Sequence, residues 1–257
     1  MTRSKIIAIA NQKGGVGKTT TAVNLSTALA AVGSSILLID FDPQGNASTS
    51  VGLSNQQREN DVYKLLSHGL AVESSIVKTQ IPNLDIIPAT VDLAAIESET
   101  ADLDGREFLL KSRLRHMNAD YDYIFIDCCP SLGLLTMNAL AAAHSVLIPL
   151  QCEFLALEGL AHLLNTVQLI KSAVNRDLYI EGVLLTMSDK RNRLSQQVAK
   201  DVREKLKKLV YDTVIPRNVK LSEAPSHGKP AILYDFVCLG SIAYMMLAKE
   251  FLAKNTY

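Results

Sequence analysis

The stretch AIANQKGGVGKTTTAVNL, residues 8–25, constrains the fold of this chain more than any other. An apolar run at residues 5–10 predicts a buried strand, and a helical pattern that stops at Gly33 covers residues 17–32. Between them, glycines let backbone N–H groups approach phosphate oxygens, and the helix N-terminus adds partial positive charge. This order of strand, glycine turn and helix predicts a phosphate-binding loop. The residues expected to hold nucleotide phosphates are Gly14, Gly15, Val16, Gly17, Lys18, Thr19 and Thr20.

The loop carries two lysines. Lys18 is expected to reach the β- and γ-phosphates of ATP, and the Thr19 hydroxyl to ligate Mg²⁺. The pattern G-x-x-x-x-G-K-[ST] is not met, because Gln12 stands where its first glycine would fall and Lys13 opens the loop instead. A lysine at the lip of the pocket is poorly placed to fold back on its own phosphates. We therefore predict that Lys13 reaches ATP held by a second copy, so that ATP holds a homodimer together.

Three aspartates lie at or just beyond the carboxyl ends of apolar strands, where open α/β sheets bind their ligands. Asp127 ends YIFID and is expected to hold Mg²⁺, usually through water. Asp40 ends SILLID and is expected to support the Mg²⁺ shell. Asp42, two residues later, is free to face an attacking water. Each carboxylate could instead cap a strand end or a neighbouring helix. Lys13, Lys18 and Asp42 are the residues expected to take part in hydrolysis.

Apolar runs alternate with helical patterns along the chain. The predicted strands cover residues 5–10, 35–40, 84–88, 123–127, 145–149, 179–186 and 213–215, and the predicted helices 17–32, 157–172, 194–209 and 239–253. Near-continuous apolar strands indicate a parallel sheet covered on both faces. We expect residues 1–257 to form one α/β domain, a P-loop NTPase with a twisted, mostly parallel sheet and helices on both faces. Residues 54–120 show blurred periodicity, and no helix-turn-helix fits before Lys5.

Composition narrows the class of protein. The first apolar run is too short for an export signal, and no stretch approaches the roughly 18 apolar residues of a membrane span. The four cysteines form no CxxC pair and no zinc spacing with histidine, so neither a structural zinc nor a disulfide framework is expected. We expect a reducing cytosol as the compartment.

The formal net charge is zero, but it is unevenly distributed. Residues 186–229 hold 11 Lys and Arg against 5 Asp and Glu. This surplus indicates either a basic face or a solvated helix surface of mixed charge. The candidate cations in the two basic segments are Lys190, Arg191, Arg193, Arg217 and Lys220.

Four further stretches extend the pattern of the loop. They are LLIDFDPQGNASTSVGL (37–53), YDYIFIDCCPSLGLLTMNAL (121–140), IPLQCEFLALEGL (148–160) and VIPRNVKLSEAPSHGKPAILYD (214–235). With KGGVGKT, they make the chain resemble the deviant Walker A ATPases, and within these the ParA/Soj chromosome-partition family. The resemblance covers nearly the whole chain apart from roughly residues 54–80.

This resemblance implies a weak Mg²⁺-dependent ATPase that dimerises with ATP and then binds double-stranded DNA without sequence preference. The five candidate cations would contact DNA, and Lys and Arg that neutralise phosphates bind any sequence. A centromere-binding partner of the ParB type would stimulate hydrolysis. The resemblance also implies an adenine pocket near Pro216 and Asn218, and a cytoplasmic, nucleoid-associated location for either a chromosome or a plasmid system.

Two departures from the family pattern stand out. Cys128-Cys129-Pro130 replaces the usual pair of prolines after the Walker B acid, which frees a backbone dihedral and restores an N–H. FVCLGSIAYMMLAKEF (236–251) is apolar where many relatives are rich in Lys and Arg.

Three rival functions share the loop. A MinD-like membrane ATPase calls for a basic amphipathic C-terminal helix, which MMLAKEFLAKNTY does not provide, so no stable membrane association is expected. An iron-protein reductase of the nitrogenase type calls for cluster ligands, and the cysteines are not in such contexts. A bare ATP-binding regulator without a DNA role is the third.

Overall fold

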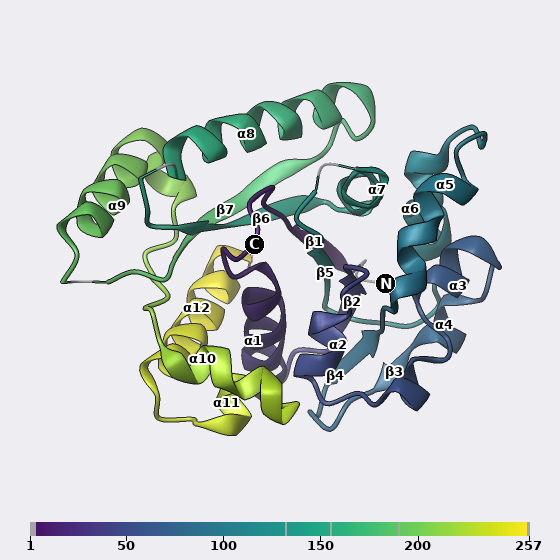
Figure 1. Cartoon of the computed structure of the whole chain (residues 1–257), viewed down its shortest axis with the longest axis horizontal. Coiled ribbons are helices and arrows are strands. Elements are labelled where there is room, and N and C mark those ends of the chain that lie inside the picture. The colour runs from purple at the N-terminus through teal and green to yellow at the C-terminus, as the bar shows by residue number, and fades with distance from the viewer. Residues whose placement is uncertain (1–3, 132, 155, 190, 256–257) are drawn as a thin grey trace.

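A seven-stranded sheet runs through the computed structural model, which describes residues 4–131, 133–154, 156–189 and 191–255 (Figure 1). The strand order is β3-β4-β2-β5-β1-β6-β7. All neighbours pair in parallel except β3 and β4, which are antiparallel at one edge. The strands are β1 (Lys5–Ile9), β2 (Ile36–Phe41), β3 (Val77–Lys78), β4 (Leu84–Ile87), β5 (Tyr123–Cys128), β6 (Ser145–Gln151) and β7 (Tyr179–Thr186).

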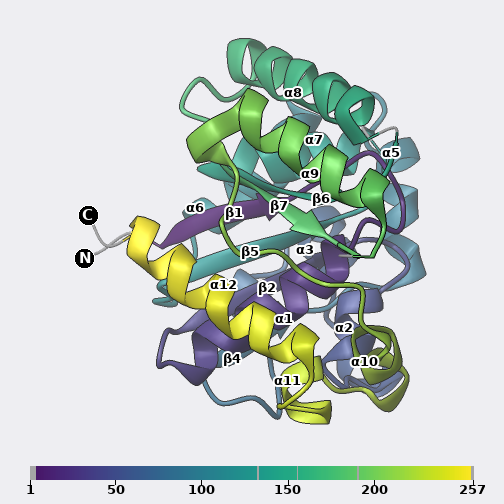
Figure 2. The ribbon, with the colours of Figure 1, turned by 90° about the vertical axis from the view of Figure 1, so that its left-hand side faces the viewer.

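Alternation along each strand produces two cores, one on each face of the sheet. In β1, Ile7 and Ile9 pack into one core, while Ala8 packs into the other. The first core lies under α1 (Lys18–Ala31), α2 (Asn46–Ser50), α10 (Val219–Glu223), α11 (Ala231–Tyr234) and α12 (Leu239–Asn255). The second lies under α3 (Val62–Ser67), α4 (Val72–Ser75), α5 (Ile96–Glu99), α6 (Leu109–Arg115), α7 (Leu134–Ala142), α8 (Ala156–Ala173) and α9 (Arg193–Leu206). Figures 1 and 2 show these two helical layers.

The predicted fold class is confirmed. Six of the predicted strands correspond to β1, β2, β4, β5, β6 and β7, and the four predicted helices to α1, α8, α9 and α12. Gly33 adopts a φ of 98° and its N–H donates to the Ala30 carbonyl, as expected for a helix stop. Short 3₁₀ turns complete the chain: η1 (Asn55–Arg58), η2 (Val91–Ala95), η3 (Arg106–Phe108), η4 (Lys207–Leu209) and η5 (Ala224–His227).

The strand predicted at residues 213–215 is wrong. This segment runs beside β7, and the amides of Tyr211 and Ile215 donate to β7 carbonyls at 3.0 and 2.9 Å. However, the amides of Asp212 and Thr213 donate to the carboxylate of Glu250, each at 2.8 Å. The four-residue step from Tyr211 to Ile215 also matches only a two-residue step of β7, from Val183 to Leu185, so no regular ladder forms and the structure has only isolated bridges here.

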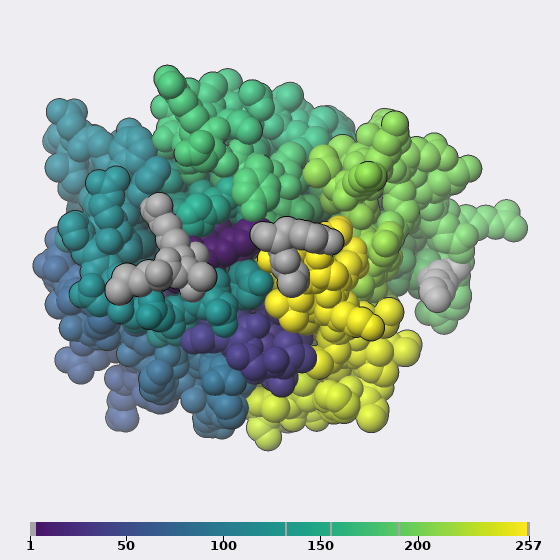
Figure 3. All heavy atoms as spheres, turned by 180° about the vertical axis from the view of Figure 1, so that it is seen from behind, coloured from purple at the N-terminus to yellow at the C-terminus, as the bar shows by residue number. Residues whose placement is uncertain are grey.

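The long C-terminal helix holds the helix that follows the phosphate-binding loop. α12 packs on α1, and Figure 3 shows the C-terminal helix in yellow beside the purple N-terminal part of the chain. Tyr244, Leu247 and Phe251 are buried at this contact. The hydroxyl groups of Tyr244 and Thr21 lie 3.1 Å apart, which fixes α12 close to the first turn of α1. No helix in the described part of the chain has the length and apolarity to cross a bilayer.

A buried ion pair joins β1, β7 and α12 at the amino edge of the sheet. Lys5 pairs with Glu181 at 2.6 Å, and the Glu181 side chain is 4% exposed. Glu181 also accepts from Ser145 Oγ at 2.7 Å and from Asn255 Nδ2 at 2.9 Å. Burial acts to raise the pKa of Glu181, but the hydrogen bonds from Lys5, Ser145 and Asn255 outweigh it and lower that pKa.

We predict that Glu181→Gln lowers the free energy of unfolding at pH 7 by about 1–3 kcal/mol, because it leaves Lys5 without its anion. A lowered pKa means that the stabilisation by Glu181 is present above the ordinary carboxyl pKa and is lost as pH falls through the folded-state pKa. The difference in the free energy of unfolding between Glu181→Gln and wild type should therefore become smaller at acid pH. Urea melts at pH 7 and below pH 4 measure both effects. The exposed Glu158→Gln is the matched control, and equal melts of Glu181→Gln and wild type at pH 7 would contradict the prediction.

Candidate functional site

The loop between β1 and α1 forms a nest of backbone amides at the carboxyl edge of the sheet. Gly15 and Gly17 adopt φ values of 73° and 90°, where L side chains are strained. Gly17 is also the N-cap of α1, so glycine at this point allows the chain to turn directly into the helix. The loop therefore presents the N-terminus of a 14-residue helix together with its own N–H groups.

Neighbouring strands hold the loop in place. The Thr186 hydroxyl at the end of β7 donates to the Val16 carbonyl at 2.8 Å, and both residues are buried. Asn11 donates from Nδ2 to the Pro149 carbonyl of β6 at 2.7 Å and accepts from the Lys13 amide at 3.0 Å. These contacts tie the two ends of the loop to β6 and β7.

Lys18 lies inside the loop. Its side chain is largely buried, and Nζ donates to the Lys13 carbonyl at 3.0 Å. Burial lowers the pKa of Lys18, and the nearby carboxylate of Asp127 opposes that shift. An ammonium held across its own loop in this way is positioned to meet phosphate oxygens placed in the nest.

Asp40 and Asp127 are brought side by side by the register of β2 and β5. Both are fully buried, and burial raises the pKa of each, of Asp40 to about 6 and of Asp127 well above its ordinary value. The charge of Asp40 further raises the pKa of Asp127, whereas the nearby Thr19 hydroxyl and Lys18 ammonium lower it. The two carboxyl groups therefore share a small, dry space next to the loop.

The two carboxyl groups differ in their partners. Asp40 Oδ2 accepts from both the amide and the hydroxyl of Ser48, each at 2.7 Å, and Oδ1 accepts from the Asp42 amide at 3.4 Å. Neither oxygen of Asp127 has a hydrogen-bond partner of normal geometry among the described residues. A buried carboxylate without donors is costly unless a cation meets it.

This arrangement fits Mg²⁺. In the described residues, no three His, Cys, Asp or Glu side chains are grouped to hold a metal by themselves. Mg²⁺ in phosphate sites is usually held by one or two carboxylates, phosphate oxygens and water. Asp127, with its free oxygens, and the Thr19 hydroxyl supply this kind of incomplete oxygen set, while Asp40 orients the adjoining chain.

Asp42 lies in the turn between β2 and α2. Its Oδ1 accepts from the Gln44 amide at 3.0 Å, and Asp40 and Ser48 fix both ends of the turn. The side chain is buried and contributes electrostatically to the environment of both Lys18 and Asp127. The structure thus places Asp42 close enough to Lys18 and Asp127 for their charges to interact.

Lys13 is held by its own chain. Its ammonium forms an ion pair with Glu153, which follows β6, and its side chain remains about half exposed. Sequence reasoning missed Glu153, because nothing in the spacing of QCEF links it to the loop. The Lys13 ammonium, at the lip of the pocket, is therefore already paired with a carboxylate of its own chain.

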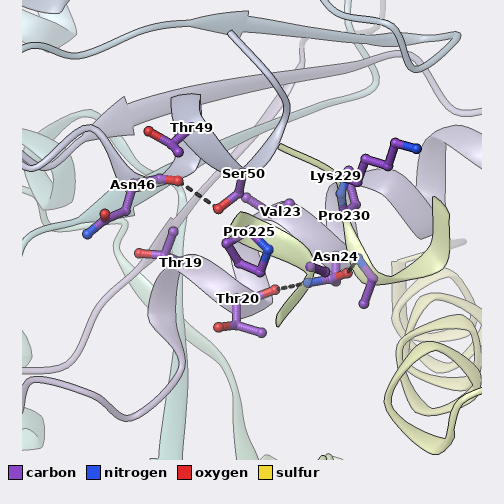
Figure 4. Close-up of a pocket in the computed structure, with 12 residues that line it drawn as sticks. Thr19, Thr20, Val23, Asn24, Asn46, Thr49, Ser50, Pro225, Lys229 and Pro230 are labelled. Atoms are coloured by element: carbon purple, nitrogen blue, oxygen red, sulfur yellow. Dashed lines mark hydrogen bonds between the residues drawn. The ribbon is translucent and has the colours of Figure 1, made fainter. Parts of the chain in front are cut away.

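A cavity of ≈ 240 Å³ adjoins the first turn of α1 (Figure 4). It lies between α1, α2 and η5. Asn24 forms part of one wall, donating to the Thr20 carbonyl and accepting from the Ala231 amide, each at 2.8 Å. The residues that line the cavity include Thr19, Thr20, Asn46, Pro225, Lys229 and Pro230.

Pro216 and Asn218, the predicted adenine contacts, are not among the residues that line this cavity. Pro216 forms an isolated bridge with Ser188, and Asn218 caps α10 by accepting from the Lys220 amide at 2.8 Å. The predicted adenine role therefore remains a prediction.

The structure brings the two basic segments together. The Arg217 amide donates to the Ser188 carbonyl at 3.1 Å, so the segment at 217–220 runs beside the loop that contains Arg191. Arg191, Arg193 and Arg217 are exposed. Arg191 pairs with Asp189 at 3.3 Å, and Lys220 pairs with Glu223 at 2.9 Å. The fifth candidate, Lys190, lies outside the described residues.

The adjacent cysteines lie beside the carboxylates. Cys128 is buried, and burial raises the pKa of its thiol well above the ordinary value. Cys129 is also buried and its Sγ lies 3.2 Å from Ser131 Oγ. These surroundings favour the neutral thiol of Cys128 over the reactive thiolate.

Comparisons with known proteins agree with this geometry. The family model described as an AAA domain matches residues 4–180. The chain is 53% identical to the chromosome partitioning protein ParA of Caulobacter vibrioides over 98% of this chain and 95% of that protein. It is 55% identical to the sporulation initiation inhibitor protein Soj of Bacillus subtilis over 98% of this chain and 99% of that protein.

A solved structure adds the ligands of a related site. The crystal structure of a Mycobacterium smegmatis protein named cobyrinic acid a,c-diamide synthase, with bound ADP and magnesium, matches with a TM-score of 0.86 and 35% identity. The match covers 99% of this chain and 96% of that one. The same protein has also been solved with an ATP analogue and magnesium. A chain of this fold therefore holds both groups.

We predict that Thr186→Val loosens the phosphate-binding loop, because the buried Val16 carbonyl loses its donor at a cost of about 1–2 kcal/mol. Backbone amides of residues 14–18 should exchange with solvent about tenfold faster, which hydrogen exchange with mass spectrometry measures. Thr186→Ser keeps the hydroxyl and should restore slow exchange. Unchanged exchange in the valine variant would show that Thr186 does not hold the loop.

Proposed function

Because the chain belongs to the ParA/Soj family of chromosome-partitioning ATPases, we propose that residues 1–257 act as one ATPase domain that dimerises around ATP and binds DNA in that state. Slow hydrolysis of ATP to ADP and phosphate ends the DNA-bound state. The observation that carries the proposal is the pair of buried carboxyl groups, Asp40 and Asp127, in register beside a glycine nest that contains Lys18.

Hydrolysis requires neutralised phosphate charge and an oriented water, with little covalent chemistry from the protein. Lys18 and the loop amides neutralise charge on the phosphates. Asp127 and the Thr19 hydroxyl hold Mg²⁺, which supplies further neutralisation when bound. Asp42, fixed by the turn that Asp40 and Ser48 maintain, orients the attacking water.

Dimerisation completes the site through Lys13. To reach the nucleotide of a second copy, the Lys13 ammonium must leave Glu153. The exchange replaces one carboxylate by the several charges of a triphosphate, which favours the dimer only when ATP is bound. Turnover is then slow and depends on dimerisation, because each site lacks one cation until the partner arrives.

We predict that Asp42→Ala binds Mg-ATP but does not hydrolyse it, so that the dimer accumulates. Adding Lys13→Ala in the same chain should return it to a monomer that still binds ATP. Size-exclusion chromatography with light scattering, together with nucleotide retention, measures both states.

Two variants control this experiment. Lys208→Ala removes another exposed cation and should leave the Asp42→Ala dimer intact. Glu153→Gln keeps Lys13 but removes its ion-pair partner, and should dimerise at least as readily as wild type. If the Asp42→Ala protein stays monomeric when saturated with Mg-ATP, the proposed switch has no basis.

The proposed DNA binding depends on the two basic segments, around Arg191 and around Arg217, which lie side by side. Arg191, Arg193 and Arg217 are exposed on one connected surface, and a dimer would present each of them twice. Duplicated cations raise affinity for any duplex, since the binding energy comes from the release of counterions. The proposed location is the cytoplasm at the nucleoid, and the proposed partner that stimulates hydrolysis is a centromere-binding protein of the ParB type.

We predict that Arg217→Ala weakens binding of the ATP-bound dimer to unrelated DNA sequences to the same extent. The slope of log affinity against log salt should fall by about two, because the dimer loses two phosphate contacts. Filter binding or anisotropy with Asp42→Ala protein at several salt concentrations measures this. Lys64→Ala, on α3 beside β2 and therefore toward the other edge of the sheet from β7 and the basic segments, should change neither quantity. A preference for one sequence, or affinity that does not vary with salt, would contradict the proposal.

A further inference from the structure

The turn that carries Asp42 ends at a glycine. Gly45 is the N-cap of α2 and adopts a φ of 61°, in the left-handed region. Its amide donates to the Asp42 carbonyl at 2.9 Å, which closes the turn. Glycine reaches this conformation without strain, but it also leaves the chain free to adopt others. Contacts from outside the turn are therefore needed to keep it in one conformation.

Arg58, at the end of η1, supplies such contacts. Its Nη1 donates to the Gly45 carbonyl at 3.3 Å. Its Nη2 donates to Thr49 Oγ1 at 2.9 Å and to the Leu53 carbonyl at 3.0 Å. The three acceptors lie before α2, within it and beyond it. A planar guanidinium offers several donors in a fixed geometry, whereas the ammonium of lysine is a single point of contact. Arg58 therefore connects both ends of α2 to one rigid group.

Gly45 is also closely packed by its neighbours. A Cβ atom at this position would lie 2.8 Å from Arg58 Nη1 and 2.9 Å from the Ala89 carbonyl oxygen, closer than Cβ atoms approach in proteins. The Ala89 amide donates to the Ser48 hydroxyl at 3.2 Å, and this hydroxyl in turn donates to Asp40. Arg58 and the chain after β4 therefore meet at the start of α2, beside the carboxyl groups of the site.

The charge of Arg58 strengthens its hydrogen bonds. The side chain is partly buried, and its Nε is buried without a hydrogen-bond partner in the part of the chain that the structure describes. Burial lowers the pKa of Arg58, and the charge of Asp40 opposes that shift. All three acceptors are uncharged, and a charged donor forms a stronger bond to such an acceptor than a neutral donor does. The guanidinium is therefore a firm restraint on the turn.

A second arginine shows that partial burial alone does not indicate a role in the site. Arg113 on α6 is also partly buried, and its Nε lacks a partner among the described residues. Its Nη2 donates to the Leu66 carbonyl of α3 at 3.3 Å. Arg58 differs because its acceptors adjoin the turn that carries Asp42. Arg113 is therefore a matched control for Arg58.

We propose that Arg58 is a positioning residue for ATP hydrolysis, which holds the turn from Asp42 to Gly45 in the conformation that directs Asp42 at the attacking water. The inference rests on the proposed function, in which Asp42 orients that water. Arg58 acts through Gly45 and Thr49 and is not among the residues assigned to phosphate or Mg²⁺. Its loss should therefore slow the chemical step and leave the affinity for ATP unchanged.

The kinetic test compares wild type, Arg58→Ala and Arg58→Lys as full-length proteins. In Arg58→Ala, kcat should fall at least about tenfold while KM for Mg-ATP stays within about twofold of wild type. Light scattering with Mg-ATP should show as much dimer as in wild type, so that lost dimerisation does not explain the loss of turnover. Arg58→Lys keeps the charge without the planar fork and should recover only a small part of kcat. Added guanidinium ion, far below denaturing concentrations, should partly restore Arg58→Ala and should not restore Asp42→Ala.

A second measurement needs no nucleotide. Hydrogen exchange with mass spectrometry on the nucleotide-free protein should show amides of residues 43–51 exchanging about tenfold faster in Arg58→Ala than in wild type. Arg113→Ala removes a guanidinium of similar burial and should lower stability in urea melts by a comparable amount. However, it should leave both kcat and the exchange of residues 43–51 unchanged.

Three outcomes would overturn the inference. Turnover of Arg58→Ala equal to wild type would show that the turn holds without Arg58. An equal loss of kcat in Arg58→Ala and Arg113→Ala would show a general effect of stability, and a rise in KM without a fall in kcat would show a role in binding. A wild-type protein that does not hydrolyse ATP would refute the proposed function and this inference together, whereas active wild type with fully active Arg58→Ala refutes the inference alone.

Discussion

The pairing register of β2 and β5 is the constraint on which the rest of the site depends. It places Asp40 beside Asp127 at the carboxyl edge, with β1 and its loop on the next strand over. Two adjacent buried carboxyl groups are costly, and the raised pKa of each reflects that cost. The two hydrogen bonds from Ser48 offset this cost at Asp40, whereas only the nearby Thr19 hydroxyl and Lys18 ammonium oppose it at Asp127. Asp127 is therefore the carboxylate that a bound cation would stabilise most.

The geometry of the loop depends on contacts from distant parts of the chain. Glycines allow its conformation, but Asn11 and Thr186 connect it to β6 and β7, which lie on one side of β1. On the other side, β5 carries the carboxylate that faces Lys18. Relative movement of these strands would change the distance between the Lys18 ammonium and the Asp127 carboxylate. A central β1 with a neighbour on each side therefore explains why a flexible glycine turn can serve as a rigid phosphate site.

The sequence was sufficient for most of the fold because buried parallel strands and long amphipathic helices have strong patterns. It also placed the three acids correctly at strand ends. It failed where contacts between distant elements decide the outcome: residues 211–215 lie along only residues 183–185 of β7 and donate the amides of residues 212 and 213 to Glu250, and Glu153 pairs with Lys13 from 140 residues away. The two-residue β3 is too short for any period to show, and Asn218 caps a helix that the sequence pattern did not reveal.

The apolar character of residues 236–251 follows in part from the packing of α12 on α1. The inner half of α12 is apolar because it covers α1, and the Tyr244–Thr21 contact makes this cover part of the support of the loop. That role does not account for Leu239, Ile242 and Met246, which belong to neither core and are exposed.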